Sequence, residues 1–304
     1  MTKLKYILLL LLWWSSDINH AFSQGCSDAG FCTINSFKPG SEDSSSQEQN
    51  QLKVGAFFGS ADNSIAVYGS YFEYNRNLNH KFGLDAKLTT LAQNGNGIAT
   101  FGLSDIFINA NYKSSENLSF TLGAKIPLSD ASKTYNDLAL PMDYQASLGT
   151  TDLIFGLGYV INKIRFTAAM QHPLTQNKNE FISSNYPINS ALRSFQSTNN
   201  FERKGDVLLR VSYPLSLSSN LKLTPSILPI YHLSNDKFTD EFNNTSEIIG
   251  SQGLTLNVNA FLDYKINNKS TVQLNVALPF IVREARPDGL TRSFIANVEY
   301  RVKI

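Results

Sequence analysis

Apolar and polar residues alternate along most of the chain from residue 52 onward. In the segments 254–266, 272–282 and 294–304, apolar residues stand at almost every second position, and mostly Thr, Asn, Asp, Glu, Lys or Arg stand between them. Alternate side chains leave opposite faces of a β-strand, so each segment has one apolar and one polar face. The segments are about twice as long as a usual soluble strand, and about 9–11 tilted residues cross a bilayer. The pattern predicts membrane-spanning strands.

Twelve such segments are predicted, and they begin near residues 52, 64, 80, 100, 117, 150, 164, 205, 221, 253, 270 and 290. Tight turns such as 162–163 and 267–269 alternate with long loops such as 129–149, 176–204 and 234–252. Short turns on one side and long loops on the other are typical of outer-membrane barrels, whereas a soluble β-sandwich would favour shorter strands. We therefore expect an all-β fold, a closed antiparallel transmembrane β-barrel of about 12 strands, because lipid offers no partner for a bare strand edge.

An aspartate precedes a tyrosine by seven residues in three of these segments: Asp105 and Tyr112, Asp152 and Tyr159, Asp206 and Tyr213. The odd offset places the two side chains on opposite faces, with the tyrosine toward lipid and the aspartate toward the lumen. Membrane barrels carry aromatic girdles at their interfaces. The predicted girdle consists of Tyr74, Tyr112, Tyr159, Tyr213, Tyr264 and Tyr300.

The polar faces supply a predicted set of lumen-lining residues: Lys87, Asp105, Lys125, Asp152, Arg165, Asp206, Arg210 and Asp263. Both signs of charge occur, which indicates an ion-paired network rather than a single-sign filter. Such pairs either fill and stiffen the barrel, since buried charges need partners, or form a polar constriction on a solute path. A barrel of about 12 strands lies between side-chain-filled and water-filled barrels, so any pore should be narrow.

Composition narrows the possible functions. Charged residues make up 17% of the chain, the net charge is +1 and the mean hydropathy is −0.17. These values argue against a nucleic-acid binder and exclude a polytopic helical membrane protein. No phosphate loop, metal-ligand cluster or nucleotide fingerprint is present, so the sequence predicts no cofactor and no metal.

The beginning of the chain is expected to direct export. Lys3 and Lys5, an apolar run and the Ala21–Ser23 cleavage site indicate a signal peptide at 1–23. Residues 24–51 are then a periplasmic segment and linker, and residues 52–304 form the barrel. Cys26 and Cys32 are expected to form a disulfide in an oxidising compartment, with lipidation of Cys26 as an alternative. The segment is positioned to plug the barrel from the periplasmic side.

A family resemblance adds to this interpretation. The stretch Gly102-Leu103-Ser104-Asp105-Ile106 leading to Tyr112, the stretch 124–128, Leu140-Pro141 and the stretch 145–153 resemble motifs of the MetA-pathway of phenol degradation family. That family comprises outer-membrane barrels similar in style to transporters of hydrophobic compounds. The resemblance covers mainly residues 100–165. It implies a narrow channel or transporter for small, hydrophobic or aromatic solutes.

Two other functions stay open. His232 and Ser234 resemble the His-x-Ser pair of outer-membrane lipid hydrolases, in which the histidine accepts the serine proton. The alternation in 221–227 predicts that His232 faces inward, away from lipid. A structural or adhesion barrel would instead act through its extracellular loops, above all the loop 176–204 with Phe181, Tyr186, Phe195 and Phe201.

The expected location is the cell outer membrane. Its lipids are the expected partners, together with a small-molecule solute and not nucleic acid. Tyr300, Val302 and Ile304 resemble the C-terminal signal read by the barrel-assembly machinery, with Ile304 in place of the usual terminal aromatic residue.

Overall fold

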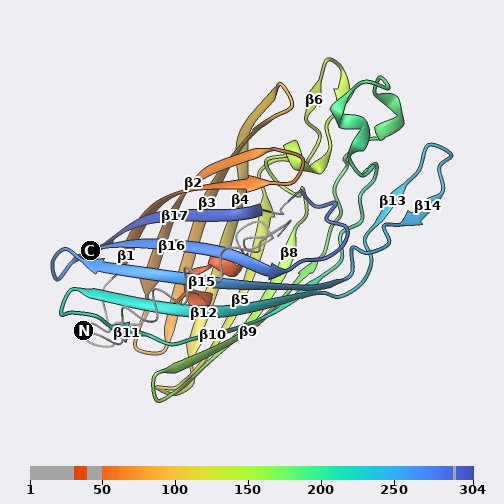
Figure 1. Cartoon of the computed structure of the whole chain (residues 1–304). Coiled ribbons are helices and arrows are strands. Elements are labelled where there is room, and N and C mark those ends of the chain that lie inside the picture. Colours follow the sequence, from red (N-terminus) through yellow and green to blue (C-terminus); the bar gives the residue numbers. More distant parts are fainter. Residues whose placement is uncertain (1–30, 40–49, 290–291) are drawn as a thin grey trace.

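The computed structural model describes residues 31–39, 50–289 and 292–304. One antiparallel sheet of thirteen strands closes on itself through the pairings β1–β17 and β10–β12 (Figure 1). One of the thirteen, β11 (Leu215–Ser216), is a two-residue piece, so twelve strands span the wall. These are β1 (Gln51–Ala61), β2 (Ala66–Asn77), β3 (Phe82–Gly95), β4 (Ile98–Lys113), β5 (Leu118–Pro127), β8 (Asp152–Ile161), β9 (Ile164–Pro173), β10 (Asp206–Ser212), β12 (Leu221–His232), β15 (Gly253–Lys265), β16 (Ser270–Ile281) and β17 (Arg292–Lys303). The predicted twelve-stranded closed barrel is confirmed.

The remaining elements lie outside the wall. Two small hairpins extend the long loops, and five short 3₁₀ helices lie in the loops and in the segment 31–39. The hairpins are formed by β6 (Thr134–Tyr135) with β7 (Leu138–Ala139) and by β13 (Lys237–Thr239) with β14 (Thr245–Glu247). The 3₁₀ helices are η1 (Phe31–Thr33), η2 (Asn35–Phe37), η3 (Met142–Tyr144), η4 (Ser183–Asn185) and η5 (Ala191–Ser194). No helix in the described ranges is long and apolar enough to cross a membrane.

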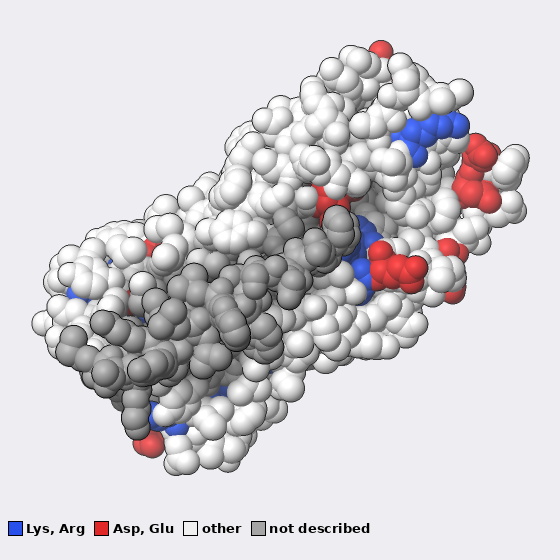
Figure 2. All heavy atoms as spheres, in the orientation of Figure 1, with Lys and Arg blue, Asp and Glu red and all other residues white. Residues whose placement is uncertain are grey.

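The alternation seen in the sequence becomes two faces of the wall. In β15, Thr255, Asn257 and Asn259 are buried inside the barrel. The residues between them are turned outward with the other apolar side chains of the wall. On the face in Figure 2, charged side chains gather mainly near the ends of the barrel. Large apolar side chains are exposed on all sides of the wall, among them Val54, Phe72, Leu84, Phe101, Ile108, Leu122, Phe155, Leu209, Ile227, Leu274 and Val298. An apolar belt of this extent fits a hydrocarbon surrounding rather than water.

The connections define two ends of the barrel. At the turn end, short connections such as 78–81, 162–163 and 266–269 join neighbouring strands, and Ile304 lies there. At the loop end, the connections 128–151, 174–205, 233–252 and 282–291 are long. The first two connections at the loop end, 62–65 and 96–97, are tight turns, which the loop pattern did not anticipate. Asn96 and Gly97 both have positive φ, as two-residue hairpin turns require.

The long loops have apolar cores of their own at the loop end. One core joins Leu140, Tyr144, Phe181 and Phe195 from two loops to Ile65 at the tip of the first hairpin. A second core combines residues of three loops: Ala131, Met142, Leu148, Phe201 and Ile248. The loops are therefore folded structures packed on the rim of the barrel, and Figure 1 shows them gathered at that end.

Candidate functional site in the barrel lumen

Residues 31–39, which we call the plug segment, lie inside the barrel (Figure 1). Cys32, Ile34 and Phe37 are buried in one cluster with residues of the inner wall. The wall residues of this cluster form the apolar sector of the lumen, which comprises Phe107, Ile154, Ala169, Leu208, Leu228 and Ile230. The Phe37 ring lies so close to Gly156 of β8 that a Cβ there would stand 2.1 Å from the ring. The glycine therefore provides the space in which the ring sits.

Polar side chains from several strands reach the backbone and side chains of the plug segment. Lys87 donates to the hydroxyl of Thr33 at 2.5 Å, and Arg165 donates to the carbonyl of Ser36 at 2.8 Å. Arg210 donates to the carbonyl of Phe37 at 2.5 Å. Lys53 donates to the amide oxygen of Asn35. Among the described residues, no strand pairing or other backbone–backbone hydrogen bond joins the plug segment to the wall.

Glu299 of β17 is the main anionic contact of the plug segment. Its carboxylate lies 2.7 Å from the ammonium of Lys38 and accepts a hydrogen bond from Tyr71 at 2.5 Å. Arg301 lies 2.5 Å from the same carboxylate and 3.3 Å from that of Asp263. These groups are buried, so each charge depends on its partner. A network of opposite charges thus surrounds the plug segment on the β1–β2–β17 side.

Of the three aspartates of the Asp–Tyr repeat, Asp105 and Asp206 bind the long loops directly and Asp152 does so through Lys125. Asp105 accepts hydrogen bonds at 2.7 Å from Ser104 beside it and from Ser147 of the loop 128–151. Asp152 lies 2.9 Å from the ammonium of Lys125, which also donates to Thr150 at 3.0 Å. All of these side chains are buried, so the wall holds the loop by polar contacts as well as by packing.

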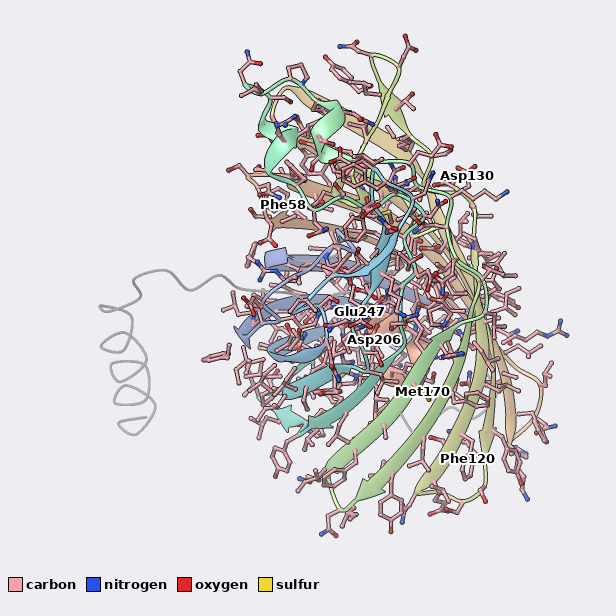
Figure 3. The ribbon with its side chains drawn as sticks, turned by 90° about the vertical axis from the view of Figure 1, so that its right-hand side faces the viewer. Phe58, Phe120, Asp130, Met170, Asp206 and Glu247 are labelled. Atoms are coloured by element: carbon pink, nitrogen blue, oxygen red, sulfur yellow. The ribbon has the colours of Figure 1, made fainter. Side chains whose placement is uncertain are left out.

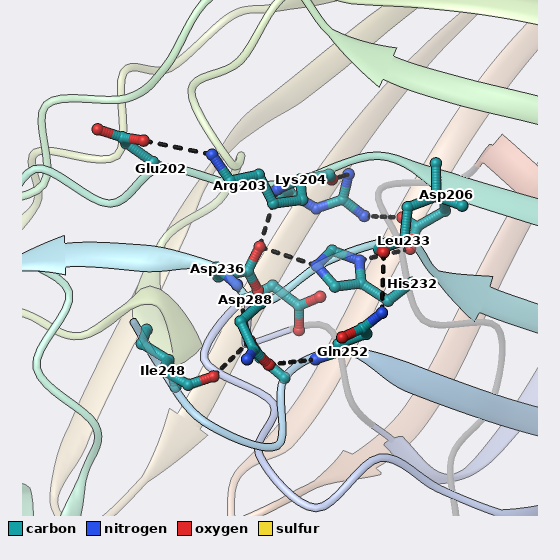
Figure 4. A network of polar contacts seen from close by, with 12 residues as sticks. Glu202, Arg203, Lys204, Asp206, His232, Leu233, Asp236, Ile248, Gln252 and Asp288 are labelled. Atoms are coloured by element: carbon teal, nitrogen blue, oxygen red, sulfur yellow. Dashed lines mark hydrogen bonds and ion pairs between the residues drawn. The ribbon is translucent and has the colours of Figure 1, made fainter. Parts of the chain in front are cut away.

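The third aspartate of the repeat, Asp206, belongs to a charged cluster at the loop end (Figure 4). Arg203 donates to Asp206, whose other oxygen lies 2.7 Å from Nδ1 of His232. Nε2 of His232 lies 2.8 Å from Asp236. An imidazole that donates to a carboxylate from each nitrogen carries both protons and a positive charge. The cluster ties the loop 174–205 and the loop 233–252 to the ends of β10 and β12.

The eight predicted lumen residues therefore lie in three places. Lys87, Arg165 and Arg210 contact the plug segment, whereas Asp105, Lys125, Asp152 and Asp206 anchor the long loops. Asp263 lies in the wall and pairs with Arg301 and with Gln273. All are buried except Arg165, which is partly exposed.

The six predicted girdle tyrosines lie at the turn end. The register places Tyr74 opposite Leu52, Tyr112 opposite Phe82 and Tyr159 opposite Leu118, and these partners stand near the strand ends. Four of the six are 41 to 51% exposed, namely Tyr159, Tyr213, Tyr264 and Tyr300. Figure 3 shows Phe120, which follows the turn after Tyr112, at the same end of the wall.

Only one of the two cysteines, Cys32, lies in the described part of the chain. Cys32 is buried within the plug segment, whereas Cys26 lies outside the described residues, as does the predicted signal peptide 1–23. The disulfide and the alternative lipidation of Cys26 therefore stay predictions. Within the described ranges, no group of three or more His, Cys, Asp or Glu side chains could hold a metal ion.

The contacts of His232 bear on the hydrolase alternative. The inward orientation expected from the alternation of 221–227 agrees with its burial. A general base needs a free ring nitrogen to take the serine proton, but both nitrogens of His232 are within hydrogen-bond distance of carboxylates. Ser234 is exposed. This arrangement favours a structural role for His232.

The adhesion alternative relied on the aromatic residues of the loop 176–204. Phe181, Tyr186 and Phe195 are buried in the loop core, and the Tyr186 hydroxyl donates to the carbonyl of Ala139 at 2.9 Å. These rings hold the loops together and do not face outward, so they do not form a contact surface.

A hollow of about 620 Å³ lies on the outer face of the wall, across β4, β5, β8 and β9. Exposed rings of Phe120 and Phe155 flank it, and Gly156 and Ala169 form part of its floor. The hollow belongs to the apolar belt. Gly156 separates this hollow from the ring of Phe37, which lies on the inner side of the wall.

Sequence reasoning missed the plug contacts of Lys38 and the partners of His232. Lys38 precedes a proline in a short polar-flanked segment, so nothing in its neighbourhood points to Glu299, which is 261 residues away. The carboxylate partners of His232 were also not identified. Asp236 stands four residues after His232, in the loop that follows β12. Asp206 stands directly opposite His232 in the pairing of β10 with β12, so the register of these two neighbouring strands brings the groups together.

Comparison with known proteins bears on the fold. No protein-family model matches the chain, and no curated protein sequence matches it significantly. An outer-membrane channel from Pseudomonas putida F1 is similar in structure, with a TM-score of 0.59 and 12% identity over 88% of this chain and 99% of that chain. The CymD monoaromatic hydrocarbon channel has a TM-score of 0.47 and 10% identity over 94% of this chain and 95% of that chain. The NanC porin has a TM-score of 0.44 and 9% identity over 84% and 98%.

The first of these similarities carries the argument, because the other two TM-scores are too low to support one. At 12% identity it shows the fold and no more. It agrees with the type of barrel that the resemblance of residues 100–165 implied. The chain has the fold of an outer-membrane channel.

Proposed function

We propose that this protein is a narrow outer-membrane channel for small solutes, closed by the plug segment in the state described. The observation that carries the proposal is the way the plug segment is attached. It occupies the lumen but is held by side-chain contacts and by one buried ring, without strand pairing among the described residues. A segment held in this way can leave while the wall stays intact.

The lumen supports a solute path in two further ways. Its inner face carries ionic and amide side chains, which would be costly inside a barrel that serves only as a packed core. The apolar sector, with Phe107, Ile154 and Leu208, offers a surface for small hydrophobic or aromatic solutes. The resemblance to the phenol degradation family favours the same class of solute.

The surroundings of the channel follow from the same proposal. The turn end faces the periplasm, as the short turns of outer-membrane barrels do, and the girdle tyrosines lie at that lipid interface. Residues 1–23 direct export, and residues 24–51 are a periplasmic segment and linker. The C-terminal strand, with Tyr300 and Val302, is read by the barrel-assembly machinery.

The test is single-channel conductance of refolded protein in planar bilayers. The double variant Phe37→Ala/Lys38→Ala removes the buried ring and the ion pair with Glu299, so the plug segment should leave the lumen. We expect a several-fold rise in mean conductance. The control Phe242→Ala removes a ring that is 75% exposed on a loop, and it should leave the conductance unchanged. An unchanged conductance in the double variant would show that the plug segment does not close a channel.

A further inference from the structure

Five neutral polar residues form a continuous patch on the inner wall, which we call the polar strip. Ser226 of β12 stands opposite Asn259 of β15, and Asn257 follows two residues along on the same face. The strip comprises Thr224 and Ser226 of β12, Asn257 and Asn259 of β15 and Asn275 of β16. Phe261 of β15 lies between Thr224 and Asn275, because it stands opposite Thr224 on one side and opposite Asn275 on the other.

The strip has hydrogen-bonding atoms that find no partner in the described part of the chain. Both side-chain atoms of Asn257 and the amide oxygens of Asn259 and Asn275 lack one. The hydroxyls of Thr224 and Ser226 also lack one. All but Asn275 are at most 3% exposed. Buried polar groups are nearly always paired in native proteins, and leaving one unpaired is unfavourable. A concentration of such atoms on three adjacent strands therefore points to a partner that is not part of this protein.

The chemistry of the strip limits what that partner is. Hydroxyl and amide groups carry no charge, and they both donate and accept hydrogen bonds. The strip borders the apolar sector directly, because Leu228 stands opposite Asn257. A molecule in the middle of the lumen would meet hydrocarbon on one side and hydroxyl and amide groups on the other. Binding sites of this kind suit a mostly apolar ligand that a few polar groups orient.

We propose that the middle of the lumen is a binding site for neutral ring compounds that carry hydroxyl or amide groups. The ring lies on the apolar sector and the polar groups bond to the polar strip. The ring of Phe37 occupies the apolar sector in this structure, so the ligand and the plug segment compete for it. This inference rests on the proposed channel function and names its solute class.

The test measures ligand binding to the full-length protein in detergent by saturation-transfer NMR. This measurement does not depend on whether the protein conducts. The probes are cyclohexane-1,2-diol, which has both required parts, and cyclohexanecarboxylate, which is charged. The diol should bind, and the carboxylate should bind at least about tenfold more weakly, which corresponds to about 1.4 kcal/mol. Phe37→Ala should strengthen binding of the diol because the competing ring is gone.

The decisive variant is Asn257→Leu/Asn259→Leu, which keeps the number and branching of the side-chain heavy atoms and removes the hydrogen-bonding groups. It should weaken diol binding at least about tenfold, again about 1.4 kcal/mol. Thr167→Val is the control, since Thr167 is buried on the inner face of β9 outside the strip. Folding of each variant is checked by the heat-modifiable shift on a gel.

Equal diol binding in a folded Asn257→Leu/Asn259→Leu protein and in the parent would overturn the inference, and so would equal binding of the carboxylate. Failure of the channel proposal looks different. In that case the Phe37→Ala/Lys38→Ala protein conducts no better than its parent, whatever the diol does. If the protein conducts but does not bind the diol in preference to the carboxylate, the channel proposal stands and the proposed binding site is ruled out.

Discussion

In the middle of the barrel, the lumen is filled by a short segment whose contacts to the wall are a buried ring and single polar side chains. At the loop end, it is covered by long loops that share two apolar cores and are bonded to Asp105, Lys125 and Asp206 in the wall. The plug segment and the long loops both combine apolar packing with polar contacts to the wall, but in different proportions. The plug segment has no core apart from the wall, so it can be displaced without unfolding anything else. The loops cannot be displaced without breaking their own cores.

This difference predicts opposite effects of substitutions at the loop end and at the plug segment. Changes at the loop end should lower the stability of the barrel, whereas changes at the plug segment should alter conduction and leave stability nearly constant.

The largest stability effect is expected for His232→Ala. The substitution leaves the buried carboxylates of Asp206 and Asp236 without a shared cation. Breaking a buried ion pair by removing one partner costs about 3–5 kcal/mol. Urea unfolding of the refolded barrel, followed by gel mobility, measures the loss. His172→Ala is the control, because His172 is exposed on β9. If His232→Ala unfolds at the urea concentration of the parent, the charged cluster does not hold the loop end.

Gly156→Ala should affect conduction rather than stability. The added Cβ would stand 2.1 Å from the ring of Phe37, so the ring has to move and the plug segment loses its packing contact with β8. We expect a several-fold rise in conductance at nearly unchanged urea midpoint. Gly83→Ala in β3 is the control, because an added Cβ there would meet no atom nearer than the amide oxygen of Asn77 at 3.4 Å. Equal conductance of the two variants would mean that Phe37 does not hold the plug segment.

The smallest effect is a pH dependence of the loop end through Asp143 in η3. Burial raises the pKa of Asp143 to about 7, and the nearby carboxylates of Asp62 and Asp288 act in the same direction. In an unfolded chain the pKa of an aspartate is about 3.9. The protonated form therefore stabilises the folded loops at low pH, and this contribution is lost as pH rises from about 4 toward about 7.

Limited proteolysis of the loop 128–151 measures this effect. Cleavage should be slower at pH 5 than at pH 8, and Asp143→Asn should reduce the difference. Because burial also raises the pKa of Asp62, a part of the difference should remain in the variant. The same cleavage rate at both pH values in the parent would contradict the expectation that protonated Asp143 stabilises the loops.

Much of the fold could be predicted from the sequence, because strand alternation is a local property. Residues 254–266 reveal two faces without any knowledge of their neighbours. The same reasoning placed Asp105, Asp152 and Asp206 on the inner face, where all three are buried. The loop partners of Asp105 and Asp206 could not be predicted, since Ser147 and Arg203 reach them through loop folding that has no period. The partners of Asp152 are Lys125 and Gln171 of the neighbouring strands.

What the sequence by itself determined is the wall: which segments are strands, which face of each is apolar, and which ends carry the long loops. Period, strand length and turn residues act within a few positions, so they can be read along the chain. Only the tertiary structure decided what fills the wall. Lys38 meets Glu299 and Phe37 fits over Gly156 because the plug segment lies inside the closed barrel. His232 meets Asp206 because the register of β10 with β12 places them opposite each other. No local pattern encodes those distances.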